Sequence, residues 1–121
     1  HAAKAPVWRY YLSRVPDGLR GKQPGVPHGG EVAPVFGTAD LCDCTGAPPT
    51  DRDRAASQAM AARWVSFARD GRPDVAGLPA WPADAKFKNV LLEFGDRQVV
   101  RPGFMQHRLN AFIGVGNLLG R

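Results

Sequence analysis

The sequence predicts an α/β fold with an incomplete sheet. Three features support this class: a strand with apolar residues on both faces, one strongly amphipathic helix, and a hairpin near the C-terminus. A strand that is apolar on both faces belongs in a sheet covered by helices on two sides. One such strand cannot form that sheet by itself, so we expect further strands upstream of these 121 residues.

The first predicted element is a strand from Val7 to Arg14. Its segment, PVWRYYLSRVP, is rich in β-branched and aromatic residues and has a proline at each end. A connection rich in glycine, proline and aspartate follows over residues 16–50, and only GEVAPVFG within it could form a short helical turn. A connection of that length is usually functional or a sign that elements are missing from the count.

The clearest helix is predicted from Asp53 to Asp70. Thr50 can cap its N-terminus, and the aspartates of its first turn suit the positive end of the helix dipole. Gly71 supplies the left-handed residue that ends the helix. Apolar residues at helical spacing are expected to pack as core, and they are Ala56, Met60, Trp64, Phe67 and Ala68.

The last predicted elements are a hairpin and a helix. NVLLEF and RQVV flank Gly95 and Asp96, which are predicted to form a two-residue hairpin turn. A final helix is predicted from about Gly103 to Phe112, and the glycines after it favour fraying. His107 lies in this helix and is interpreted as a surface histidine.

Charge and cysteine content restrict the function classes. The net charge is +5, but the arginines are scattered from Arg9 to Arg121, so we interpret them as a solvated surface and expect no nucleic-acid partner. No apolar run approaches the roughly 18 to 20 residues of a membrane span, so no membrane partner is expected. Cys42 and Cys44 would close a strained ring if bridged, and a metal site would need further ligands. We expect free thiols in a loop and no bound metal.

Read in order, five segments resemble the C-terminal part of the type B carboxylesterase family, which includes the cholinesterases. They are PVWRYYLSRVP, GVPHGGEVAPVFG, DRAASQAMAARWVSFARDGRPD, LPAWPAD and LLEF. The family pattern has a His-Gly pair and an acid three residues after the histidine, ahead of Val-Phe-Gly. Here these are His28, Gly29, Glu31 and residues 35–37. The family series along the helix and its exit is matched by Ser57, Met60, Trp64, Phe67, Ala68, Gly71 and Pro73.

The sequence departs from the family pattern at three places. Asp74 stands where the family often has asparagine, and Asp84 follows a Trp-Pro pair where an aromatic residue is common. Asn110 stands where some members have a cysteine, so we expect that disulfide to be absent. None of the three changes touches the chemistry that the resemblance implies.

The resemblance implies that residues 1–121 are the C-terminal fragment of an α/β-hydrolase fold. The fragment would comprise the last core strand, the histidine loop, the long helix, and the terminal hairpin and helix. The family site uses a serine in a G-x-S-x-G turn, an acid and a histidine, in that chain order. This sequence contains no G-x-S-x-G and no HGGG-like oxyanion segment. We therefore expect the nucleophile, the acid and the oxyanion donors to lie upstream, and this fragment alone to be an inactive part of a serine carboxylesterase.

In this interpretation His28 is the triad histidine, which acts first as general base and then as general acid. Pro27 restricts the approach of its loop, while Gly29 and Gly30 let the backbone pass close by. Glu31 is expected to support the site with negative potential, or to cap the short helical turn that starts there. The resemblance further implies a small-molecule carboxylic ester as substrate and no cofactor.

Two alternatives to a catalytic role stay open. The first is a non-catalytic, cholinesterase-like fragment used for binding or adhesion, against which the retained His28 and its flanking glycines argue. The second is a small basic binding module, against which the scattered charge and the unpaired two-faced strand argue. The sequence specifies neither the ester preference, the compartment nor the oligomeric state.

Overall fold

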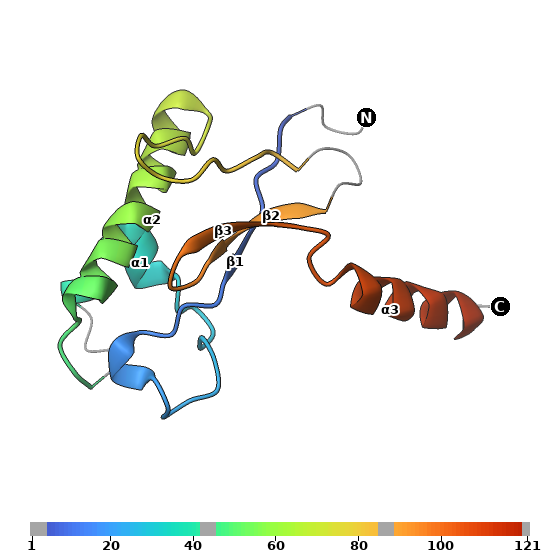
Figure 1. The fold of residues 1–121 in the computed structure, drawn as a ribbon, viewed down its shortest axis with the longest axis horizontal. Coiled ribbons are helices and arrows are strands. Elements are labelled where there is room, and N and C mark those ends of the chain that lie inside the picture. The colour runs from blue at the N-terminus through green and yellow to red at the C-terminus, as the bar shows by residue number, and fades with distance from the viewer. Residues whose placement is uncertain (1–4, 42–45, 85–88, 120–121) are drawn as a thin grey trace.

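A computed structural model describes residues 5–41, 46–84 and 89–119. The expectation for Cys42 and Cys44 therefore lies outside the described residues. Figure 1 shows the arrangement: a long helix lies on one side of a small sheet, and a second helix extends away from the sheet. In chain order the elements are β1 (Tyr10–Leu12), η1 (Asp17–Leu19), α1 (Val32–Phe36), η2 (Ala39–Leu41), α2 (Asp51–Asp70), β2 (Val90–Phe94), β3 (Gln98–Pro102) and α3 (Gln106–Leu119).

The sheet is mixed and has the strand order β1-β2-β3. β1 runs parallel to β2, with Tyr10 opposite Leu92, and β2 runs antiparallel to β3. A second neighbour for β1 is absent from the described residues, so its outer edge is unpaired there. The side chains of Tyr10 and Tyr11 remain 38% and 40% exposed. The described residues thus leave a two-faced apolar strand only partly covered, as expected for an incomplete sheet.

β1 is shorter than the predicted strand from Val7 to Arg14. The backbone N–H groups of Ser13 and Arg14 both donate to the carbonyl of Phe94, each at 3.0 Å. Two successive amides cannot share one acceptor in an extended ladder, because successive N–H groups of a strand point to opposite sides. The chain therefore leaves the sheet after Leu12, and the last two predicted strand residues lie outside the strand.

The prediction of a two-residue hairpin turn was wrong. Phe94 pairs with Gln98, so three residues, 95–97, connect the strands. Within this turn the N–H of Gly95 donates to the carbonyl of Arg97 at 3.3 Å. The added residue places Asp96 at the tip, where its carboxylate accepts hydrogen bonds from Arg14 and Arg20.

α2 begins and ends where its capping residues predict. The Thr50 side chain accepts from the N–H of Asp53 and the Asp53 side chain accepts from the N–H of Thr50, a reciprocal capping box. Gly71 ends the helix with φ at 70°. The helix starts at Asp51, two residues before the predicted Asp53, because the residue after the cap is already helical.

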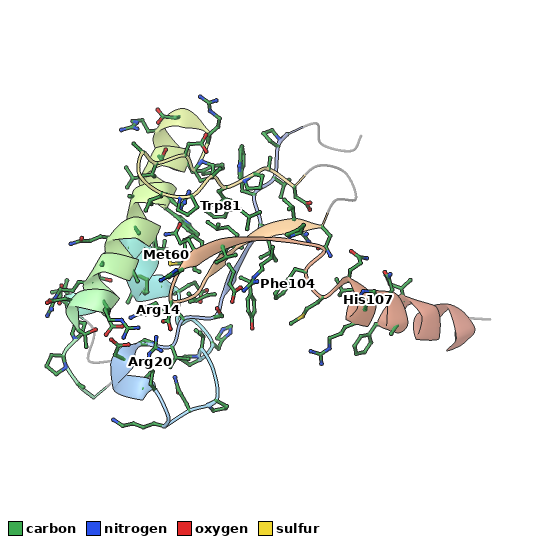
Figure 2. The ribbon with its side chains drawn as sticks, in the orientation of Figure 1. Arg14, Arg20, Met60, Trp81, Phe104 and His107 are labelled. Carbon is green, nitrogen blue, oxygen red and sulfur yellow. The ribbon has the colours of Figure 1, made fainter. Side chains whose placement is uncertain are left out.

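The core lies between α2 and the sheet, where Figure 2 shows Met60 and Trp81. Its buried apolar members are Met60, Trp81, Leu92 and Phe94. Trp64 packs against this cluster as predicted. The prediction for Phe67 was wrong: it is 48% exposed and meets Trp8 edge-on at 5.7 Å. Arg63, four residues before it, is instead completely buried.

α3 is longer than the predicted helix, which was expected to fray after Phe112. It continues to Leu119 because neither Gly114 nor Gly116 adopts the left-handed conformation that ends a helix. In Figure 1 it projects away from the sheet, and the side chain of Phe112 is 78% exposed. Within the described parts of the chain, no helix combines the length and the apolar character needed to cross a bilayer.

Candidate active site

His28 lies in the first of two consecutive tight turns between η1 and α1. The N–H of Gly30 donates to the carbonyl of Pro27 at 3.0 Å, and the N–H of Val32 donates to the carbonyl of Gly29 at 3.1 Å. The His28 side chain is exposed to solvent. The turns therefore present the imidazole at the surface instead of burying it in the core.

The two glycines after His28 are required for different reasons. Gly29 has φ at 74°, in the left-handed region that side chains disfavour. Gly30 has no such dihedral angle, but a Cβ there would lie 2.6 Å from Cγ1 of Val26 and 3.0 Å from the carbonyl oxygen of Pro27. The loop thus needs Gly29 for its backbone conformation and Gly30 for its close approach to Val26 and Pro27.

A cavity of about 720 Å³ opens beside the histidine loop. His28, Gly29 and Gly30 form part of its wall, and α2 and the sheet supply the opposite side. The apolar part of that side includes Leu12, Met60 and Phe94. The histidine therefore borders a concave and partly apolar space, the usual setting of a small-molecule site.

Glu31 immediately precedes α1. Its side chain makes no capping hydrogen bond to the helix, so the alternative role as a side-chain cap is not supported. Burial raises the pKa of Tyr10, and the negative charge of Glu31 raises it further. The charge of Glu31 therefore reaches the side chain of Tyr10 on β1.

The three serines of the sequence are all engaged in structural hydrogen bonds. Ser13 donates to Glu93 at 2.6 Å, Ser57 to the carbonyl of Pro34 at 3.3 Å, and Ser66 to the carbonyl of Asp74 at 2.6 Å. None of these bonds involves His28. Within the described residues the histidine therefore has no serine in the arrangement of a nucleophile and its base.

An ion-pair network borders the same cavity. Arg14, with a side chain only 9% exposed, donates to the carboxylates of Asp53 at 2.6 Å and Asp96 at 2.8 Å. Figure 2 shows Arg14 and Arg20 close together near the start of α2. Burial tends to raise the pKa of Asp53, but hydrogen bonds from Thr50, Arg14 and the N–H of Asp17 outweigh it and lower the pKa.

This network was missed by the sequence interpretation, which treated Asp53 only as a favourable charge in the first helical turn. Its partners come from positions 14, 17 and 96, and no local pattern joins such distant residues. The only signal was an acid at the third helical position after a capping threonine.

The described residues contain no group of three histidine, cysteine, aspartate or glutamate side chains placed to hold a metal ion. His107 lies on α3, away from the sheet and from the histidine loop, as Figure 2 shows. Of the three predicted site residues, His28 and Gly29 thus lie together on the cavity wall, whereas Glu31, two residues after Gly29 in the chain, is not among the residues that line the cavity.

Comparisons of the sequence with a family model and with curated proteins point to the same family. The sequence model of the Carboxylesterase family matches residues 1–112. Carboxylesterase 5A of Canis lupus familiaris is 33% identical over 96 residues, which are 74% of this chain and 16% of that protein. The pyrethroid hydrolase Ces2a of Mus musculus is 32% identical over 83 residues, which are 66% of this chain and 14% of that protein. The chain thus spans about a sixth of the curated relatives that it matches.

Solved structures show the same fold at low sequence identity. A PNB esterase superposes with a TM-score of 0.70 at 21% identity, over 87% of this chain and 21% of that chain. An esterase from Clostridium hathewayi, described as hydrolysing aliphatic aromatic polyesters, gives a TM-score of 0.74 at 20% identity, over 87% of this chain and 20% of that chain. The prediction of an incomplete α/β-hydrolase sheet is therefore confirmed.

Proposed function

Because this chain belongs to the carboxylesterase family, we propose that His28 is the general acid–base residue of a serine carboxylic-ester hydrolase. The nucleophilic serine, the acid that orients the imidazole and the oxyanion donors lie outside these 121 residues. In this proposal residues 1–121 supply one member of a catalytic triad and the elements that hold it.

The observation that carries the proposal is the placement of His28. It lies on a loop shaped by Gly29 and Gly30, at the wall of a cavity, and the sequence resemblance makes it the counterpart of the family histidine. No side-chain hydrogen bond to another described residue engages its imidazole, and the ring is exposed. Both ring nitrogens are thus free for the two partners that a triad histidine needs, a serine hydroxyl and a carboxylate.

The proposed reaction begins when the serine hydroxyl attacks the ester carbonyl and His28 removes its proton. The same proton is then given to the leaving alcohol as the tetrahedral intermediate collapses to an acyl-enzyme. Water next attacks the acyl carbonyl by the same sequence of proton transfers and releases the carboxylic acid. Imidazole suits both steps because it gains and loses a proton near neutral pH.

Carboxylic esters are the proposed substrate class, and no cofactor is needed for this chemistry. Glu31 is proposed to support the site by adding negative potential behind the imidazolium that forms during the reaction.

Two findings count against the alternative of a small basic binding module. The family match extends over residues 1–112. Six of the described arginines form ion pairs with aspartates of the same chain, and they are Arg9, Arg14, Arg20, Arg52, Arg54 and Arg69.

The proposal is tested by labelling with a fluorophosphonate, which reacts covalently with activated serines. In the protein that contains the upstream segment, His28→Ala should reduce the labelling rate constant by several orders of magnitude, whereas His107→Ala should not change it. The 121-residue chain alone should not be labelled, because Ser13, Ser57 and Ser66 are hydrogen-bonded to other partners and not to His28. Labelling of the 121-residue chain, or an unchanged rate in His28→Ala, would contradict the proposal.

A further inference from the structure

We propose that one face of α2 positions the His28 loop by holding it at both ends, with Arg14 and Asp53 as positioning residues. The histidine loop consists of residues 15–31, which follow Arg14 and precede α1. The inference rests on the proposed role of His28, because it explains how a surface loop would keep the imidazole in place for proton transfer.

The start of the loop is attached to the first turn of α2. Oδ1 of Asp53 accepts a hydrogen bond from Arg14 at 2.6 Å and a second from the backbone N–H of Asp17 at 3.2 Å. The hydroxyl of Thr50 donates to Oδ2 of Asp17 at 2.7 Å. The capping residues of the helix therefore also bind η1, the first element of the loop.

The hairpin turn reinforces this attachment from the other side. Arg14 donates to Asp96 at 2.8 Å, and Arg20 binds both Asp96 and Asp17, the latter at 2.8 Å. Arg14 is the central member because its planar guanidinium contacts both α2 and the hairpin. The side chains of Arg14 and Asp53 are each only 9% exposed, so solvent screens their attraction little.

The end of the loop is held through α1, which contacts the next turns of α2. The Ser57 hydroxyl donates to the carbonyl of Pro34 in α1 at 3.3 Å. A Cβ on Gly37, the residue that ends α1, would lie 3.8 Å from Cβ of Ala61. Asp53, Ser57 and Ala61 are spaced four residues apart, so they lie on one face of α2. A single helix face thus contacts both ends of the segment that contains His28.

The conformation of the middle of the loop depends on the contacts at its ends. Residues 23–29 donate no backbone-to-backbone hydrogen bond to another described residue. The turns beside His28 are closed by the N–H groups of Gly30 and Val32. Because the loop itself contributes few bonds, release of either end should open these two turns without unfolding α2.

Amide hydrogen exchange in the purified protein tests this inference. Asp53→Asn removes the charge that binds Arg14, and Asp51→Asn is the matched control because it is an acid of the same helical turn with a fully exposed side chain. We expect exchange at Gly30 and Val32 to accelerate about tenfold or more in Asp53→Asn, but not in Asp51→Asn. Amides of α2 after Ser57 should keep their wild-type rates in both variants.

A second variant and a kinetic readout separate positioning from a general loss of stability. Arg14→Lys retains the charge but cannot contact Asp53 and Asp96 with a planar fork, so its exchange rates should be intermediate. Where ester turnover is measurable, Asp53→Asn should lower kcat and leave KM nearly unchanged. Wild-type exchange at Gly30 and Val32 in Asp53→Asn, or equal acceleration in the loop and throughout α2, would overturn the inference. Because exchange is independent of turnover, this outcome is distinct from a failure of the proposed catalytic role.

Discussion

The guanidinium of Arg63, which is completely buried, donates a 2.8 Å hydrogen bond to Oε1 of Gln98 on β3. The same group donates to the backbone carbonyls of Pro73 at 2.9 Å and Pro79 at 2.6 Å. Burial lowers the pKa of Arg63, and the charge of Asp74 opposes that shift. One buried cation therefore joins α2, the segment that follows it and the hairpin.

Removal of Arg63 should destabilise the protein strongly. Arg63→Ala leaves one buried and two partly buried hydrogen bonds without their donor and opens a cavity beside Trp81, over which the guanidinium lies at 5.8 Å from the ring centroid. We expect a loss of about 3 kcal/mol or more in the free energy of unfolding, measured by urea denaturation. Arg69→Ala, at an exposed position of the same helix, should cost less than about 0.5 kcal/mol. Equal effects of the two variants would show that the Arg63 contacts contribute nothing to stability.

The apolar core should respond most at Leu92. This residue is completely buried on β2, between the two other strands. Leu92→Ala should lower the free energy of unfolding by about 2 to 5 kcal/mol, through lost burial and a residual cavity. Val65→Ala changes a residue of α2 that is 61% exposed and should cost far less. If Leu92→Ala lowered the free energy of unfolding no more than Val65→Ala, Leu92 would not be a central residue of the core.

The close approach at Gly30 should not tolerate a side chain. Gly30→Ala would force Val26 or the carbonyl of Pro27 to move, because the added Cβ meets them at 2.6 Å and 3.0 Å. We expect distortion of the turn that carries His28, seen as a change in the His28 ring proton shifts and as a loss of about 1 to 3 kcal/mol in stability. Gly25→Ala is the control in the same loop, since a Cβ there meets nothing within 4 Å. Identical spectra for the two variants would refute the steric argument.

Acid should weaken the contribution of Asp53 to stability. Its pKa is lowered in the folded state, because the hydrogen bonds from Thr50, Arg14 and Asp17 outweigh the opposing effect of burial. The stabilisation is therefore fully present above the unfolded-state pKa of aspartate, about 3.9. It is lost as the pH falls through the lower folded-state value.

The measurement is the free energy of unfolding as a function of pH for wild type and Asp53→Asn. The difference between the two proteins should be largest near neutral pH and should shrink as the pH falls below about 4, because protonation of Asp53 removes the same charge. A difference that stays constant across this range would show that the charge of Asp53 is not the stabilising feature.

Local sequence signals predicted those elements whose ends are set by nearby residues. Thr50 and Gly71 defined α2 to within two residues, because capping depends on side chains adjacent to the helix ends. The strand around Tyr10 and the hairpin were predicted at the correct places in the sequence. The predicted lengths of the strand and of the hairpin turn were wrong. The length of β1 depends on contacts between residues about eighty positions apart, as between Ser13 and Phe94. The length of the hairpin turn depends on the register of β2 and β3, in which Phe94 pairs with Gln98.

Contacts between distant segments explain the features that the sequence did not predict. A 3.6-residue period placed Phe67 in the core, yet only tertiary packing decides which residues of a stripe meet the sheet. Arg63 was not expected to be buried, because its acceptors are a side chain on β3 and two carbonyls of the segment that follows α2. His28 became a candidate through the family resemblance, since an isolated histidine between proline and glycine has no specific local pattern.

The central claim, that His28 transfers protons in ester hydrolysis, is tested most directly by kcat for His28→Ala with and without added imidazole. The measurement uses a chromogenic short-chain ester and the protein that contains the upstream serine and acid. We expect kcat to fall by about a thousandfold or more. Imidazole should restore part of it, because the exposed position of His28 leaves the site open to a small base. A variant that keeps nearly the wild-type kcat, with no response to imidazole, would contradict the account.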